Sequence, residues 1–267
     1  MPHYGWVPDL PDQRDFLYAA PVENMAALPS SVDLRPECPK TVYDQGQLGS
    51  CTANAIAGAL EFDRIKQGLP DFIPSRLFIY YNERVMEGTV GTDSGAQIRD
   101  GIKSVGSIGA PPETDWPYDI TEFAAKPSVK AYKDAPLDKA VQYQRVAQVL
   151  AQMKGCLASG YPFVYGFTVY ASFESTQVAQ TGIVPMPAAG EKVLGGHAVV
   201  AVGYDDNSQR FIVRNSWGPG WGMAGYFTVP YAYLTDTNLS DDFWTIRLVA
   251  KAAATLAAER SRSAGSR

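Results

Sequence analysis

The sequence has few of the residues that build disulfide frameworks and metal sites. Its 267 residues include three cysteines and two histidines. Three cysteines allow at most one internal disulfide and leave one odd thiol, which excludes a disulfide-stapled scaffold. Two histidines and scattered carboxylates form no metal-ligand spacing, and there is no G-x-x-x-x-G-K-[ST] phosphate loop. We therefore expect no metal and no cofactor, and the odd thiol becomes a candidate nucleophile.

The chain also lacks long apolar runs and a basic patch. No stretch approaches the roughly 18–20 apolar residues that a membrane span needs, and no charged segment followed by an apolar one opens the chain. The net charge is −5, and because residues 251–267 are basic, the remainder is more acidic still. This charge disfavours nucleic acid as a partner. We expect a cytoplasmic monomer that contacts neither nucleic acid nor membrane.

What the sequence does contain is enough apolar material for a sizeable core. Hydrophobic residues make up 46% and aromatic residues 12% of the chain, which excludes disorder of the whole chain. Five prolines fall within residues 1–30, so we expect residues 1–28 to form an extended arm. Residues 29–250 are expected to form the domain, and residues 251–267 a flexible tail.

The first half of this domain has helical periodicity. Helices are predicted at residues 50–67, from Ser75 onward and from Ser94 onward. In the second of these, Leu77, Phe78, Tyr81 and Val85 are expected to share the core-facing side.

The second half has the alternation of strands. A helix is predicted at 148–159, and strands are predicted at 141–145, 163–170, 197–204, 210–214, 225–229 and 244–249. Helices followed by strands predict an α+β fold with two lobes. The helical lobe would cover about 45–125 and the antiparallel β lobe about 135–250, with a cleft between them.

Three short windows carry the candidate chemistry: Q-G-Q-L-G-S-C at residues 45–51, G-G-H-A at 195–198, and N-S-W-G-P-G-W-G at 215–222. Cys51 is expected at a helix N-terminus, whose partial positive charge favours a thiolate. Because His3 lies in the arm, His197 is the candidate base. Taken singly, such residues are most often structural, but their joint occurrence in this order favours a catalytic site.

The order and spacing of these windows resemble the papain-like cysteine proteases, peptidase family C1, over about residues 28–249. The opening of the chain and its missing disulfide cysteines look most like the bacterial members of the xylellain type. The resemblance implies a papain-like two-lobe fold and an endopeptidase that hydrolyses peptide or protein substrates. It implies Cys51 as nucleophile of a thioester pathway, His197 as acid and base, Asn215 as the residue that orients it, and Gln45 as an oxyanion donor.

The same resemblance implies a substrate groove. Ser94 and Gly95 would pair with an extended substrate backbone. Gly166 and Ala198 would line a roomy apolar pocket for the second side chain before the scissile bond, with Gly196 beside it. Trp217 would shield the contact between His197 and Asn215 from water.

The sequence departs from the family at two positions near the nucleophile. Leu48 stands where the family commonly has a cysteine, and Thr52 where it has an aromatic residue. Two alternatives remain open: a transglutaminase-like acyltransferase that uses the same thioester chemistry, and a catalytically silent peptide-binding relative. A peptidase transfers the acyl group to water and an acyltransferase transfers it to an amine, so the acceptor distinguishes the first alternative. Alkylation of the thiol distinguishes the catalytically silent relative.

Two further expectations concern segments outside the catalytic windows. Cys38 and Cys156 are expected to form a disulfide under oxidising conditions. The arm is expected to cross or border the cleft and lower activity, with Trp6, Leu10, Phe16 and Leu17 filling pockets. The alternative is an arm packed on the outside of one lobe.

Overall fold

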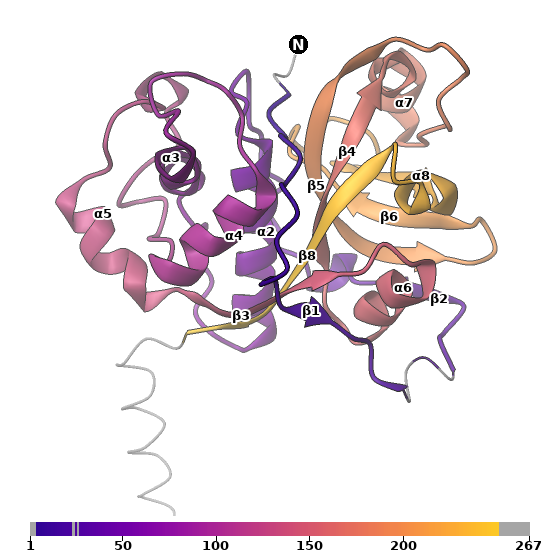
Figure 1. Cartoon of the computed structure of the whole chain (residues 1–267), viewed down its shortest axis with the longest axis horizontal. Helices are drawn as coiled ribbons and strands as arrows, with labels where there is room; N and C mark the ends of the chain where they lie inside the picture. Colours follow the sequence, from indigo (N-terminus) through magenta and orange to yellow (C-terminus); the bar gives the residue numbers. More distant parts are fainter. Residues whose placement is uncertain (1–3, 23–24, 26, 251–267) are drawn as a thin grey trace, which may run out of the picture.

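Helices occupy the first half of the domain because its apolar residues recur at helical spacing. The computed structural model describes residues 4–22, 25 and 27–250. Ser75 caps its second long helix, as predicted, by accepting a hydrogen bond from the backbone N–H of Phe78. The helical lobe, on the left in Figure 1, contains α2 (Cys51–Lys66), α3 (Arg76–Glu87), α4 (Ile98–Ser107) and α5 (Val129–Asp134).

Strands of the second lobe form one eight-stranded sheet in the order β1-β3-β8-β4-β5-β6-β7, with β2 paired to β5. Among the strands of the described residues, only β1 and β3 pair in parallel, so the sheet is mainly antiparallel, as predicted. The strands are β1 (Leu17–Tyr18), β2 (Ser31–Asp33), β3 (Ala140–Val146), β4 (Phe163–Tyr170), β5 (Val193–Asp205), β6 (Arg210–Arg214), β7 (Tyr226–Pro230) and β8 (Ser240–Val249). Three helices flank them: α6 (Leu150–Ala158), α7 (Thr176–Thr181) and α8 (Tyr231–Thr235).

Helix α2 lies between the lobes and packs against both (Figure 1). It contacts α3 and α4 on one side and strands β5 and β8 on the other. Alanine stands at its positions 53, 55, 57 and 59, and such small side chains let neighbouring elements approach closely. Every residue from Cys51 to Arg64 is buried. The N-terminus of α2 is therefore fixed where the two lobes meet.

Three details of the helical prediction were wrong. Helix α4 begins at Ile98 instead of near Ser94, because the preceding residues form a loop in which Gly95 has a φ of +72°. Val85 of α3 is 49% exposed, because Ile79 and Tyr80 take the core-facing side instead. The helices also extend to Asp134, beyond the expected end of the lobe near 125.

The N-terminal arm runs between the two lobes (Figure 1, indigo). The backbone N–H of Trp6 donates to Gly196 in the β lobe (2.9 Å), and that of Val7 donates to Ala96 in the helical lobe (3.0 Å). The arm then reaches the sheet edge, where β1 pairs with β3. The expected tail at 251–267 lies outside the described residues.

All three cysteines are buried and free. The predicted disulfide between Cys38 and Cys156 is not formed in this structure. The Cys156 thiol is directed to the carbonyl oxygen of Tyr161 (3.6 Å), whereas the Cys38 thiol lies near Arg214 and Tyr226. The described part of the chain has no helix with the length and apolar character of a membrane span.

Candidate active site

Cys51 is the first residue of α2, and Ser50 is its N-cap residue. The Asn54 side chain donates to the Ser50 carbonyl oxygen (2.9 Å), which fixes this first turn. The unpaired N–H groups of such a turn give it a partial positive charge. The thiol therefore lies at the positive end of a helix, as expected, but Cys51 is 0% exposed.

His197 of β5 is held by Asn215. The distance between His197 Nε2 and Asn215 Oδ1 is 2.8 Å, and the same amide oxygen accepts from the backbone N–H of Ser216 (2.9 Å). Because this oxygen can only accept, Nε2 carries the proton in this contact. The other ring nitrogen, Nδ1, has no hydrogen-bond partner within residues 4–22, 25 and 27–250. The imidazole is thus oriented, with one nitrogen available for proton transfer.

Aromatic rings enclose the histidine. The Trp217 ring stacks on His197 with centroids 5.1 Å apart, and Phe167 presents an edge at 5.7 Å. This packing excludes water from the contact between His197 and Asn215.

Gln45 is also fixed and fully buried. Its side-chain oxygen accepts from the Ser216 hydroxyl (2.7 Å), and its amide nitrogen donates to the Leu48 carbonyl oxygen (3.0 Å). The Gln45 amide nitrogen is therefore directed toward the loop that leads to Cys51.

The arm occupies the space in front of these residues. Its carbonyl at Gly5 accepts from the backbone N–H of Ala96 (2.7 Å). A Cβ at Gly95 would lie 2.1 Å from the Gly5 oxygen, and one at Gly5 would lie 1.7 Å from the Gly49 oxygen. Arm and domain thus approach as closely as two backbones without side chains permit.

Two arm side chains lie on either side of Gly5. The Tyr4 ring lies edge-on to His197 with centroids 6.0 Å apart, and its hydroxyl donates to Glu174. The Trp6 indole lies against Gly166, whose Cβ, if present, would be 2.0 Å from it. The arm therefore covers both sides of the nucleophile.

This coverage changes the electrostatics expected of the pair. Burial raises the pKa of the Cys51 thiol to about 11, although hydrogen bonds from the backbone N–H groups of Ala198 and Gly5 act in the opposite direction. Burial also lowers the pKa of His197 to about 4. With the arm in place, both groups are therefore pushed toward their neutral forms. The expected thiolate is not favoured in this state, because the arm excludes the water that would solvate it.

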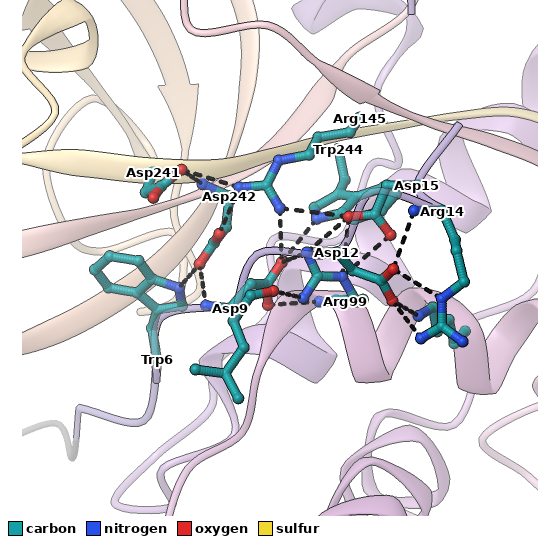
Figure 2. Close-up of polar contacts among 12 residues, drawn as sticks. Trp6, Asp9, Asp12, Arg14, Asp15, Arg99, Arg145, Asp241, Asp242 and Trp244 are labelled. Carbon is teal, nitrogen blue, oxygen red and sulfur yellow. Dashed lines mark hydrogen bonds and ion pairs between the residues drawn. The ribbon is translucent and has the colours of Figure 1, made fainter. Parts of the chain in front are cut away.

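Further along, the arm is held by a group of charges that we call the anchoring cluster (Figure 2): Asp9, Asp15, Arg99, Arg145 and Asp242. Arg99 of α4 pairs with Asp15 (2.7 Å), and Arg145 of β3 contacts Asp242 (3.0 Å) and Asp9 (3.5 Å). The cluster therefore joins the arm to both lobes at once.

The predicted groove residues lie where the arm lies, with one exception. Ser94 is exposed, and the residue whose backbone pairs with the arm is Ala96, which bonds Gly5 and Val7. Ala198 pairs with Gly166 in the sheet, so both face the same side. Within the described residues, no group of three or more histidine, cysteine, aspartate or glutamate side chains is placed so that it could hold a metal ion.

Sequence reasoning missed Ala96, Glu174 and Asp242. Asp242 is 0% exposed, and its Oδ2 accepts from the Trp6 indole N–H (3.0 Å). The available signal was the acidic pair Asp241–Asp242 directly before the aromatic residues Phe243 and Trp244 of strand β8.

Comparison with known proteins identifies the family of the chain. The profile of the papain family cysteine proteases matches residues 28–241. The chain belongs to this family. An uncharacterized peptidase C1-like protein, L477 of Acanthamoeba polyphaga mimivirus, is 42% identical and aligns over 92% of this chain and 87% of its own length. Cathepsin B-like CP3 of Giardia intestinalis is 31% identical over 75% of this chain and 69% of its own.

Among solved structures, xylellain, a cysteine protease from Xylella fastidiosa, superposes with a TM-score of 0.87 at 48% identity. The match covers 94% of this chain and 96% of xylellain. The predicted family and the papain-like α+β fold are thereby confirmed, and the protein is a cysteine-type peptidase.

Proposed function

We propose that Cys51, as a thiolate, attacks the carbonyl carbon of a peptide bond. The tetrahedral intermediate collapses to a thioester when the C–N bond breaks and His197 gives its proton to the departing amine. Water then attacks the thioester, His197 takes a proton from it, and the carboxylic acid product leaves with Cys51 regenerated. The peptide is cleaved without any cofactor entering these steps.

The observation that carries this proposal is the state of the His197 ring. Its Nε2 is fixed on Asn215 (2.8 Å), while Nδ1 is buried and has no partner among the described residues. A buried ring nitrogen without a partner is costly, and such sites often serve function. A base at Nδ1 and a thiol at a helix N-terminus form a matched pair for nucleophilic catalysis.

Gln45 is the proposed side-chain donor to the oxyanion of the tetrahedral intermediate. Its amide is held by Ser216 and Leu48, so it needs no rearrangement during the reaction. The backbone N–H of Cys51 would be the second donor. Losing one such donor slows catalysis by about 10²–10³-fold.

Alkylation rates test the thiol assignment. We expect iodoacetamide at pH 6 to modify Cys51 at least about tenfold faster than Cys38 or Cys156, because the arm can leave while the other two thiols stay in the core. The His197→Ala variant should lose this advantage. Mass spectrometry of the modified peptides reads all three sites at once, and equal rates in the unmutated protein would refute the assignment.

We also propose that the arm keeps the peptidase inactive until it is displaced. Its Tyr4, Gly5 and Trp6 lie on the residues that a substrate would need, and three backbone hydrogen bonds to Ala96 and Gly196 support its binding. A peptide and the arm would compete for the same groove.

The direction of the arm explains how it would resist cleavage. The groove expected for the second side chain before the scissile bond holds Trp6, and the leaving-amine side at His197 holds Tyr4. Tyr4 precedes Trp6 in the chain, so the arm runs opposite to a substrate. Its Gly5 directs a backbone N–H to the Cys51 thiol, and the Gly5 carbonyl oxygen is engaged by Ala96. The thiol therefore faces no carbonyl carbon in the orientation it attacks.

Inhibition by the arm should weaken as the pH rises. Burial and the charge of Asp242 raise the pKa of Asp9 to about 7, against the opposing effects of Arg99 and the Trp244 indole. In a released arm, Asp9 would have its ordinary pKa near 3.8, so the bound arm takes up a proton. The protonation of Asp9 stabilises the bound arm fully below pH 3.8, and this stabilisation is lost as the pH rises to about 7. Asp9 also contacts Arg145 of β3. Arg145 in turn pairs with Asp15 of the arm and Asp241 of β8, so these charges also lie around Asp9.

The measurement is the ratio of kcat/KM between a form lacking residues 1–7 and the full chain, from pH 5 to pH 8. The ratio cancels the pH dependence of catalysis itself, and we expect it to fall by about tenfold or more. In Asp9→Asn, which mimics the protonated group, it should stay constant. A flat ratio in the unmutated pair would contradict the prediction.

A further inference from the structure

Trp6 lies in a pocket that three residues of the sheet create. A Cβ on Gly166 would lie 2.0 Å from the indole, and one on Gly196 would lie 2.7 Å from it. Ala198 faces the same side as Gly166 because the two are paired across β4 and β5. Small residues thus leave room for a bicyclic side chain, in keeping with the roomy pocket expected from the sequence.

The pocket is not wholly apolar, because a carboxylate reaches the indole. Trp6 Nε1 donates to Asp242 Oδ2 at 3.0 Å, and the backbone N–H of Asp9 donates to the same oxygen at 2.8 Å (Figure 2). The other oxygen of Asp242 is held by Arg145 Nη2 at 3.0 Å. Asp242 itself is 0% exposed. Asp242 is therefore held by Arg145 of the domain as well as by the two donors of the arm.

When the arm leaves, Asp242 loses both donors to Oδ2 and keeps only Arg145. A carboxylate oxygen inside a pocket strongly favours a donor, and occupants that leave it unpaired pay for its desolvation. Since Arg145 already balances the charge of Asp242, the missing group is an N–H donor on a flat ring and not a second cation. The tryptophan indole supplies both the donor and a bicyclic shape that fills the pocket, as Trp6 does in the structure.

We propose that Asp242 is a specificity-determining residue that selects tryptophan as the second residue before the scissile bond. The inference rests on the proposed function, in which this pocket receives a substrate side chain once the arm is displaced. A site built to bond an N–H group discriminates against an analogue that lacks it more strongly than a purely apolar pocket can.

The test uses two fluorogenic peptides that differ in one atom group. One carries tryptophan at the second position, and the other carries 3-benzothienylalanine, in which sulfur replaces the indole N–H. We expect the full-length protein to have a kcat/KM about tenfold or more higher for the tryptophan peptide. Because the arm competes equally with both peptides, the ratio does not depend on how often the arm is released.

Variants assign the preference to Asp242. Asp242 has a φ of +60°, a conformation that glycine adopts without strain, so Asp242→Gly removes the acceptor at little cost to the backbone. In this variant the ratio should fall to about one. Asp242→Asn keeps an uncharged acceptor and should give an intermediate ratio. Glu174→Gln is the matched control, because Glu174 contacts Tyr4 and not Trp6, and it should keep the full ratio.

A ratio near one in the unmutated protein would overturn the proposal, and so would a high ratio that survives Asp242→Gly. Binding provides a readout separate from catalysis: the Cys51→Ala variant should bind the tryptophan peptide about tenfold tighter than its sulfur analogue. If neither peptide is hydrolysed, the proposed function fails. Equal binding of the two peptides would contradict only the proposal that Asp242 selects tryptophan.

Discussion

Replacing Cys51 with alanine should abolish peptide hydrolysis, with a loss of about four orders of magnitude or more in kcat. The reaction proposed here has no other nucleophile, since the Cys38 thiol lies near Arg214 and Tyr226, the Cys156 thiol contacts Tyr161, and both are buried. The fold should survive, because alanine fits the space of the buried Cys51 side chain and suits the first turn of α2. The measurement is hydrolysis of fluorogenic peptides by carefully purified protein, with circular dichroism to verify folding.

Cys51→Ser is the matched control for this change. It keeps the size of the side chain and should also be inactive, because a hydroxyl without a low pKa is a far weaker nucleophile at this site. Turnover by folded Cys51→Ala protein at more than about 1% of the normal rate would show that another group attacks the substrate.

Removing the first seven residues should raise kcat/KM by about tenfold or more. The arm is part of the same chain as the groove, so its local concentration there is high and a substrate must displace it. Because arm and substrate would compete for one groove, the gain should appear mainly as a lower KM with little change in kcat. The shorter deletion is preferable to removal of residues 1–25, which would also take away the buried Tyr18 and Ala20.

Two substitutions within the arm make the same test without truncation. Trp6→Ala should raise kcat/KM, because it removes the side chain that fills the pocket and its hydrogen bond to Asp242. Leu10→Ala should leave it unchanged, because the Leu10 side chain is 72% exposed. An unchanged kcat/KM in both the stably folded truncation and Trp6→Ala would reject inhibition by the arm.

Much of the fold could be predicted because its signals are local. The Ser75 cap, the apolar run at 163–170 and the turn-bounded strand at 210–214 each depend on neighbouring residues, and all three were found at or near their predicted bounds. The start of α4 was missed because an apolar period does not reveal a loop that turns through a left-handed glycine. The start of α4 at Ile98 depends on the path of the preceding loop, residues 89–97.

The catalytic windows could be recognised because each is a compact motif, but their surroundings could not. Asp242 meets Trp6 only through the register of β8 beside β4, which no local pattern encodes. The apolar residues Leu10, Phe16 and Leu17 were expected to fill pockets and are instead 71–72% exposed. The charges of Asp9 and Asp15 hold this part of the arm.

The ionisation of the nucleophile shows the same limit. A helix N-terminus favours a thiolate, and that much follows from the position of Cys51 in the sequence. The pKa of about 11 in the structure follows from burial beneath the arm, which is a tertiary effect. The ionisation of Cys51 beneath the arm could therefore not be predicted from its position in the sequence.

The most direct test combines the two changes in one set of four proteins: the full chain, Cys51→Ala, the form lacking residues 1–7, and that form carrying Cys51→Ala. Hydrolysis of one fluorogenic peptide is measured for all four at equal concentrations. The account predicts low activity for the full chain, higher activity for the truncated form, and none for either protein without Cys51. Activity in the truncated Cys51→Ala protein equal to that of the truncated form would contradict it.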